Sequence, residues 1–142
     1  AGRINSNFSF SSILHLGFSD KTDIIRLEKI GKNLLNMEIS DNSGRKIKHR
    51  KIIEESPEIL ISTANFRRIN EMLAEFSDKY TWSDDAGGFV CNETYFRTLD
   101  AVKKNYQNYC SVLFIHLPKF DKIDFEKQLE FVSIVARATC YD

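Results

Sequence analysis

The most apolar stretch of the chain, residues 109–117 with the sequence YCSVLFIHL, limits the fold more than any other feature. Its length and its β-branched residues indicate a strand, and its nearly continuous hydrophobicity predicts that both faces of that strand are buried. Pro118 ends the run, because proline lacks the N–H that a continuing central strand needs. A strand of this kind is typical of a sheet with helices on both faces, so we expect an α/β domain.

Alternating strand and helix signals along the chain favour the same fold class. Strand patterns cover residues 12–17, 24–30, 59–63 and 81–83, and apolar residues recur at helical spacing over 66–80, 89–106 and 125–140. Asn65 is a candidate N-cap for the first of these helices. The basic segment 45–51 follows a turn at 41–44 and is interpreted as a solvated edge strand or hairpin arm. We predict a three-layer α/β/α fold with a mainly parallel sheet.

The C-terminal helix is expected to be amphipathic, with Glu126 and Glu130 facing outward. The residues expected on its apolar face are Phe125, Leu129, Val132, Ala136 and Cys140.

Size and charge restrict the classes of partner. At 142 residues we expect a single domain over 1–142, with residues 1–11 disordered. Lysine plus arginine and aspartate plus glutamate both number 20, and this balance argues against a nucleic-acid or anionic-membrane partner. No apolar run approaches membrane-spanning length and no signal-peptide pattern opens the chain, so we expect a cytoplasmic protein. The sequence does not decide whether the protein forms a homo-oligomer.

The three cysteines, Cys91, Cys110 and Cys140, do not form a disulfide or zinc pattern. The plainest interpretation is a reduced protein whose cysteines are small buried hydrophobes. Cys91 differs because it follows Gly87 and Gly88 at the start of a predicted helix. Unpaired backbone N–H groups and the positive end of a helix favour a thiolate there, which is the environment of a reactive cysteine.

A nucleophilic thiolate needs a base, and a base needs a group that orients it. His116 closes the apolar strand just before Pro118, where a side chain can emerge from the core; a satisfied core histidine is an equal alternative. Glu28 lies in the strand pattern 24–30, and from that segment alone a surface glutamate is favoured. His15 is interpreted as a packed strand residue and His49 as exposed. Because functional groups gather at the carboxyl ends of parallel strands, we expect Glu28, Cys91 and His116 at one edge of the sheet.

These residues resemble the pyroglutamyl peptidase I (pyrrolidone-carboxylate peptidase) family of cysteine peptidases. Residues 83–92 are similar to the family's nucleophile signature S-x-D-A-G-x-(aromatic)-(aliphatic)-C-N, and residues 113–118 to its F-I-H-x-P histidine signature. Residues 27–33 resemble the segment that carries its catalytic glutamate, and the turn at 41–44 matches the turn that follows. The order and spacing of Glu28, Cys91 and His116 also agree with the family.

The resemblance implies Cys91 as nucleophile, His116 as general base and then acid, and Glu28 as the residue that orients the histidine. It implies release of N-terminal pyroglutamate from peptides through a thioester acyl-enzyme, without metal or cofactor. It also implies a geometry, in which the Glu28 carboxylate and the Cys91 sulfur lie on either side of the His116 ring, near hydrogen-bond distance.

The chain departs from the family pattern in three places. It lacks the N-terminal strand and the G-F-x-P-F loop that helps to enclose the pyroglutamyl ring. The loop after Gly17 lacks the Gly-x-Ala-Gly-Gly-Arg of many bacterial members, and Thr63-Ala64-Asn65 replaces the usual Thr-Leu-Pro. Three alternatives explain these departures. The chain is a fragment, it is a divergent enzyme with another lid, or it is a family-like protein that lost activity and acts as a non-enzymatic binding module.

Overall fold

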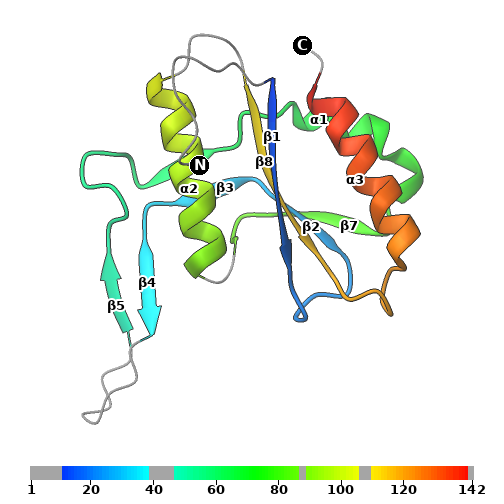
Figure 1. Cartoon of the computed structure of the whole chain (residues 1–142), viewed down its shortest axis with the longest axis horizontal. Helices are drawn as coiled ribbons and strands as arrows, with labels where there is room; N and C mark the ends of the chain where they lie inside the picture. Colours follow the sequence, from blue (N-terminus) through cyan, green and yellow to red (C-terminus); the bar gives the residue numbers. More distant parts are fainter. Residues whose placement is uncertain (1–10, 39–46, 87–88, 106–109, 141–142) are drawn as a thin grey trace.

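A four-stranded sheet forms the centre of the computed structural model (Figure 1), which describes residues 11–38, 47–86, 89–105 and 110–140. The strand order is β1–β8–β2–β7, and the bounds are Ser12–Phe18 for β1, Ile25–Glu28 for β2, Tyr80–Ser83 for β7 and Ser111–Leu117 for β8. The pairs β1–β8 and β2–β7 are parallel, and β2–β8 is antiparallel. The predicted mainly parallel sheet is confirmed. Of the segment expected to be disordered, residues 1–10 lie outside the described residues.

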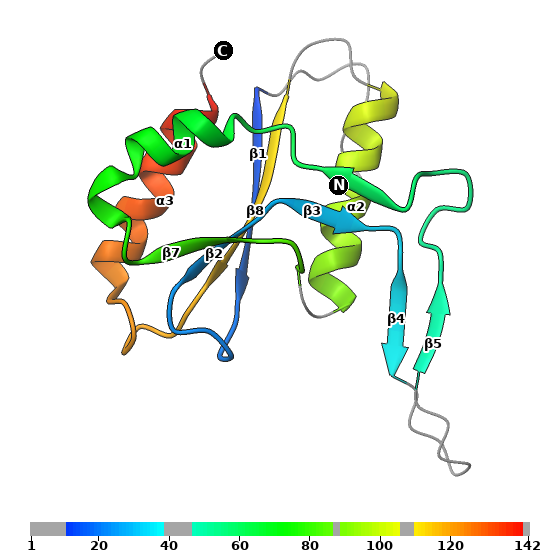
Figure 2. The same cartoon turned by 180° about the vertical axis from the view of Figure 1, so that it is seen from behind.

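Helices cover both faces of this sheet, as Figures 1 and 2 show from opposite sides. On one face, α1 (Phe66–Met72) and α3 (Phe125–Thr139) pack in a core cluster that includes Leu113 of β8. On the other face, α2 (Phe89–Asn105) packs in a second cluster that includes Phe114. The three-layer α/β/α arrangement is therefore confirmed.

The strand β8 is central and buried along its length up to His116, which confirms the prediction from its apolar run. Alternate side chains of a strand point to opposite faces, so a strand between two helical layers needs apolar residues at almost every position. His116 is the polar exception on the α2 face of β8 near its carboxyl end.

Two small sheets extend the molecule on the α2 side. The strands β4 (Leu35–Glu38) and β5 (Ile47–Arg50) pair antiparallel in a hairpin that projects from the body (Figure 2), which confirms the hairpin arm. The turn predicted at 41–44 lies outside the described residues. The strands β3 (Ile30–Lys32) and β6 (Ile59–Ile61) also pair antiparallel.

The prediction that β6 is a buried strand is wrong. Only Leu60 is buried, while Ile59 and Ile61 are exposed on the opposite side. The strand belongs to a two-stranded sheet with a helix on one side, so it buries one face only.

The first helix is shorter than predicted. Asn65 is its N-cap, as expected, and the Asn65 side chain accepts a hydrogen bond from the Arg68 N–H at 3.1 Å. The α-helix ends at Met72, and a 3₁₀ turn, η1 (Ala74–Phe76), brings Phe76 into the core before β7 begins.

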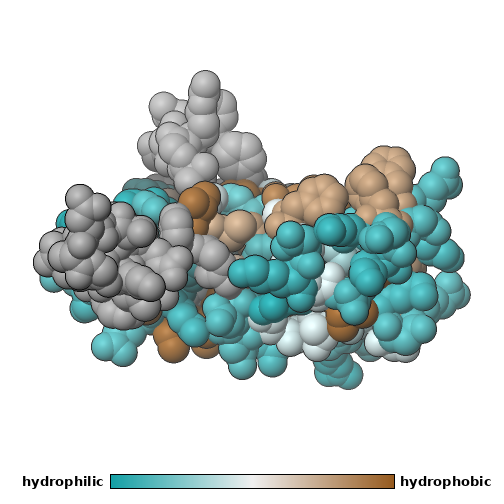
Figure 3. Space-filling model, turned by 90° about the horizontal axis from the view of Figure 1, so that it is seen from below, coloured by the Kyte–Doolittle hydropathy of each residue, from teal (hydrophilic) through white to brown (hydrophobic). Residues whose placement is uncertain are grey.

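The predicted inner face of α3 is wrong. Phe125 and Leu129 are 56% and 54% exposed, whereas the residues buried on α3 are Gln128, Phe131, Val135, Ala138 and Thr139. The helix carries two apolar stripes. The inward one packs Phe131 and Val135 into the core, and the buried Gln128 amide beside them donates to the carbonyl oxygens of Pro118 and Ile123. Apolar side chains therefore reach the surface, and Figure 3 shows such patches between hydrophilic ones.

Candidate active site

Glu28 and His116 form a buried pair on the sheet face that α2 covers. The distance from His116 Nδ1 to Glu28 Oε2 is 2.8 Å. Glu28 is fully buried and His116 is 6% exposed. This confirms the part of the expected geometry that concerns these two residues, and it overturns the interpretation of Glu28 as a surface residue.

The pair forms by a route that the sequence did not indicate. We expected parallel strands whose carboxyl ends meet at one edge, but β2 runs antiparallel to β8. Glu28 lies opposite Phe114, two residues before His116, on the same face of the sheet. Diagonal neighbours across an antiparallel pair are within reach of long side chains, so the glutamate extends along β8 to the imidazole.

The hydrogen bond assigns a role to each ring nitrogen of His116. An ionised carboxylate can only accept, so Nδ1 carries a hydrogen and donates the hydrogen bond to Glu28. In the neutral ring, Nε2 is then an unprotonated acceptor. Such an orientation prepares Nε2 to take a proton from a nucleophile.

Cys91 lies in the first turn of α2, as predicted, and is partly buried against the core cluster under that helix. The prediction that the helix start favours a thiolate at Cys91 is wrong. Burial, and then the negative charge of Glu28, raise the pKa of the Cys91 thiol. The charge effect places Cys91 within electrostatic reach of Glu28. Among the described residues, no hydrogen bond joins the Cys91 sulfur to His116, so contact between them stays a prediction.

Two neighbours of Cys91 on α2 fasten the start of the helix to the strands. The Asn92 side chain accepts from the Lys32 N–H at 2.9 Å, and its amide donates to the carbonyl oxygens of Lys32 and Leu34 at 2.9 and 3.3 Å. The buried Tyr95 hydroxyl donates to the Glu28 carbonyl oxygen at 2.7 Å. Neither residue was predicted from the sequence to have a role in the site, although Asn92 directly follows the cysteine in the nucleophile motif.

Gly17 allows β1 to lie close to the histidine. It lies opposite His116 in the parallel pair β1–β8. A Cβ at this position would stand 2.9 Å from Phe114 Cε1 and 3.2 Å from His116 Cδ2, closer than ordinary carbon contacts. The absence of a side chain at Gly17 therefore leaves room for the ring of His116.

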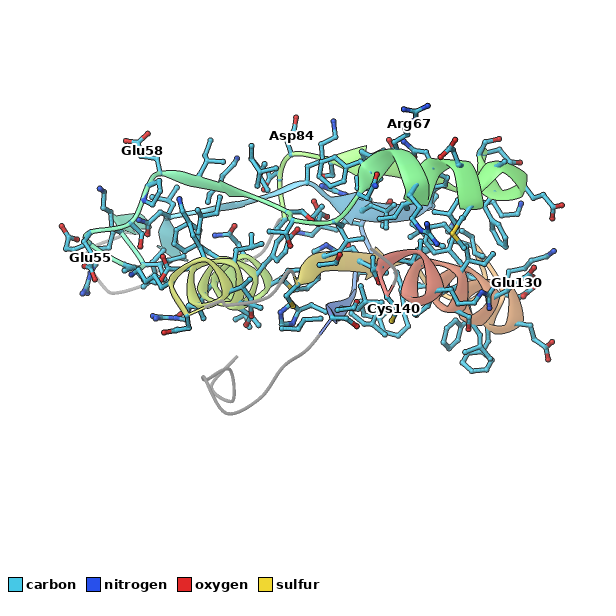
Figure 4. All side chains as sticks on the ribbon, turned by 90° about the horizontal axis from the view of Figure 1, so that it is seen from above. Glu55, Glu58, Arg67, Asp84, Glu130 and Cys140 are labelled. Carbon is cyan, nitrogen blue, oxygen red and sulfur yellow. The ribbon has the colours of Figure 1, made fainter. Side chains whose placement is uncertain are left out.

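Charged groups around the pair come from β2 and from the segment after β7. The Nε of Arg26 lies 3.5 Å from Glu28 Oε2, and no sequence motif singled this arginine out. Asp84 is exposed and points away from the body of the protein (Figure 4).

The remaining histidines are not part of this pair. The Nε2 of His15 lies 2.9 Å from the Thr98 hydroxyl oxygen and its ring stacks on Phe114, so its prediction as a packed strand residue is confirmed. The side chain of His49 lies outside the described residues. Within the described ranges, no group of three or more histidine, cysteine, aspartate or glutamate residues is placed to hold a metal ion.

Comparison with known proteins agrees with the resemblance in the motifs. The family model described as "Pyroglutamyl peptidase" matches residues 4–136. The pyrrolidone-carboxylate peptidase of Pyrococcus furiosus is 29% identical over 106 residues, which cover 74% of this chain and 50% of the relative. The enzyme of the same name from Thermococcus litoralis is 31% identical over 107 residues, covering 75% and 48%. The chain thus spans about half the length of these curated relatives.

Solved structures agree in fold. A mutant pyrrolidone carboxyl peptidase from P. furiosus superposes with a TM-score of 0.73 at 26% identity, covering 91% of this chain and 68% of that one. The pyrrolidone carboxyl peptidase of Fervidobacterium islandicum also gives 0.73 at 26% identity, covering 92% and 69%. The family model matches most of the length of this chain, so the chain belongs to the pyroglutamyl peptidase family.

Proposed function

We propose that this protein is a cysteine peptidase that releases N-terminal pyroglutamate from peptides. Cys91 is the nucleophile, His116 the general base and then acid, and Glu28 the residue that orients the imidazole. The observation that carries the proposal is the buried 2.8 Å hydrogen bond between Glu28 and His116, on the face covered by the helix that begins at Cys91. Membership of the family supports the choice of substrate.

The first half of the reaction transfers the acyl group to sulfur. His116 Nε2 takes the thiol proton as Cys91 Sγ bonds to the pyroglutamyl carbonyl carbon. Glu28 stabilises the imidazolium that forms. The imidazolium then protonates the leaving amine, the C–N bond breaks, and a thioester remains on Cys91.

The second half releases pyroglutamate. His116 removes a proton from a water molecule, whose oxygen attacks the thioester carbonyl. The C–S bond breaks, and the proton returns from His116 to the sulfur. Each half-reaction begins and ends with a neutral imidazole, so the hydrogen bond to Glu28 can keep the same tautomer throughout.

The oxyanion of each tetrahedral intermediate needs a hydrogen-bond donor. The backbone N–H of Cys91 is in the first turn of α2, where N–H groups have no partner within the helix. Such a donor typically contributes about 3 kcal/mol to lowering the barrier.

The raised pKa of Cys91 bears on the role of His116 as general base. Burial and Glu28 both raise the pKa of the Cys91 thiol, which favours the thiol over a resting thiolate. His116 then acts as a true general base, rather than as one half of an ion pair that exists before substrate binds.

The family resemblance supports catalysis without a cofactor, because the thiol, imidazole and carboxylate supply every proton transfer. All three cysteines are free thiols, which supports a reducing compartment such as the cytoplasm. In the part of the chain that the structure describes, no helix is long and apolar enough to cross a lipid bilayer.

Hydrolysis of a chromogenic pyroglutamyl amide tests the proposal. We expect the wild type to hydrolyse it, Cys91→Ala to lose the activity, and Cys140→Ala, which changes an exposed cysteine, to keep it. Mass spectrometry after mixing with substrate should find a thioester on the peptide that contains Cys91. Equal rates of hydrolysis by the wild type and Cys91→Ala would refute the assignment of Cys91 as the nucleophile. An inactive wild type would favour the alternative of a non-enzymatic binding module.

A further inference from the structure

Arg26 extends from the middle of β2 and contacts two parts of the site. Its Nη2 donates to Ser83 Oγ at 2.5 Å and to the carbonyl oxygen of Asp85 at 2.6 Å. Its Nε lies 3.5 Å from Glu28 Oε2, the same oxygen that accepts from His116. One guanidinium therefore joins the Glu28–His116 pair to the segment that leads into the helix of Cys91.

The strand positions explain this reach. Arg26 and Glu28 are two residues apart, so their side chains leave β2 on the same face. Arg26 lies directly opposite His116 in the antiparallel pair with β8. The strand β7, which pairs parallel with β2, ends at Ser83, and α2 begins a few residues later at Phe89.

The segment after β7 has hydrogen bonds of its own, and Arg26 adds an external anchor. The Asp85 N–H donates to Ser83 Oγ at 3.1 Å, and the Ser83 hydroxyl donates to the Asp85 carbonyl oxygen at 3.1 Å. These bonds fix the shape of the turn, and the strand pairing holds its first residue to β2, where the Lys29 N–H donates to the Ser83 carbonyl oxygen at 2.8 Å. Arg26 adds a side-chain link from β2 that extends past the paired residues to Asp85.

The same arginine supplies charge to a buried carboxylate. Glu28 is fully buried, and its Oε1 has no hydrogen-bond partner among the described residues. His116 offers a positive charge only when it is protonated, whereas the guanidinium is always charged. A buried ionised carboxylate without a nearby cation is costly, so the guanidinium of Arg26 offsets the charge of Glu28.

We propose that Arg26 is a positioning residue: it anchors the Ser83–Asp85 turn, and hence the start of α2, against the Glu28–His116 pair and offsets the charge of Glu28. This inference rests on the proposed function of Cys91, His116 and Glu28. A lysine could supply charge, but its single ammonium nitrogen cannot bond the two acceptors in the turn, as Nη2 of Arg26 does, while a second nitrogen faces Glu28.

The groups that could respond to pH around this arginine come from four elements. They are Glu28 on β2, His116 on β8, Cys91 and Tyr95 on α2, and the carboxylates of Asp84 and Asp85 after β7. The two aspartates are exposed, so water screens them more than it screens the buried Glu28.

Three variants separate anchoring from charge: Arg26→Met, Arg26→Lys and, as a matched control, Arg97→Met. Arg97 is on α2 and its Nε pairs with Glu93 at 2.9 Å on the exposed surface, so its removal deletes a cation without touching the site. For each variant we would measure kcat and KM on the pyroglutamyl amide. Separately, we would measure the rate of alkylation of Cys91 by iodoacetamide across pH, read by mass spectrometry.

Arg26→Met should lower kcat by roughly 10- to 100-fold, with KM changed much less, because the reacting groups lose their alignment. Its alkylation midpoint should move to higher pH, because Glu28 then opposes the thiolate without compensation. Arg26→Lys should restore the midpoint but not kcat. Arg97→Met should match the wild type in both measurements.

Unchanged kcat and an unchanged midpoint in Arg26→Met would overturn the inference. If Arg26→Met does not fold, Arg26→Lys decides: a reduced kcat with the wild-type midpoint supports anchoring, and full kcat refutes it. If the wild type hydrolyses no pyroglutamyl amide, the proposed function fails. The alkylation midpoints of the folded variants still test whether Arg26 offsets the charge of Glu28.

Discussion

Gly17 lies opposite His116 across the parallel pair β1–β8, with room for the imidazole but none for a side chain of its own. The contact joins an edge strand to the histidine from the side opposite β2. His116 is thus confined by the backbone of β1 on one side and by Glu28 on the other.

Gly17→Ala should therefore reduce activity by displacing the ring. Its Cβ would meet Phe114 Cε1 at 2.9 Å and His116 Cδ2 at 3.2 Å, so both rings must shift. Overpacking of this kind costs about 1–3 kcal/mol of stability. Steady-state kinetics at a temperature where the variant is fully folded should show a lower kcat, and an unchanged kcat would contradict the confinement of His116.

Glu28→Gln should make Cys91 easier to deprotonate while it slows catalysis. The negative charge of Glu28 is one cause of the raised pKa of Cys91, so a neutral amide lowers that pKa and moves the alkylation midpoint to lower pH. At the same time His116 loses its carboxylate, and loss of an oriented general base lowers kcat by roughly 10²- to 10⁴-fold. Alkylation and hydrolysis measured on one preparation test both effects. A midpoint that moves to higher pH would show that the charge of Glu28 does not oppose the thiolate.

Asn92→Ala should destabilise the fold by about 2 kcal/mol or more, because peptide groups of Lys32 and Leu34 lose partners in a poorly hydrated place. Chemical denaturation measures the loss. Asn105→Ala is a suitable control, since its exposed amide bonds only the preceding turn of the same helix. Equal stability of the two variants would show that the Asn92 bonds contribute little.

The inner face of α3 can be tested by two truncations. Phe131 is fully buried and packs edge-to-face on Phe76, so Phe131→Ala should cost about 3–5 kcal/mol. Leu129 is exposed, and Leu129→Ala should change stability by about 0.5 kcal/mol or less. Thermal or denaturant unfolding measures both losses. A larger loss for Leu129→Ala than for Phe131→Ala would show that the face predicted from the sequence is the buried one.

The parts of the fold that could be predicted from sequence are those with one dominant signal. The apolar run before Pro118 predicted the central strand β8, and the glycines followed by helical spacing predicted the helix that carries Cys91. The family motifs singled out Glu28 and His116, which the structure brings together. Their catalytic roles stay proposals until activity is measured.

The remaining features depend on tertiary partners that a local pattern does not contain. A strand pattern carries no direction, so the antiparallel pairing of β2 with β8 could not be predicted from it. For Glu28, alternation with Leu27 suggests an exposed face, but α2 covers that face. On α3 two apolar stripes compete, and the buried one packs Phe131 and Val135 into the core, with the Gln128 amide donating to two loop carbonyl oxygens beside them.

The four-residue strand β2 performs two tasks, one on each face. Ile25 and Leu27 fill the core under α1 and α3, while Arg26 and Glu28 hold the charges of the site. A one-residue insertion or deletion inside such a strand exchanges its faces, placing charges in the core and leucine beside the imidazole. The loop before Ile25 can therefore absorb a change in length, whereas the same change within β2 would abolish folding and chemistry in a single step.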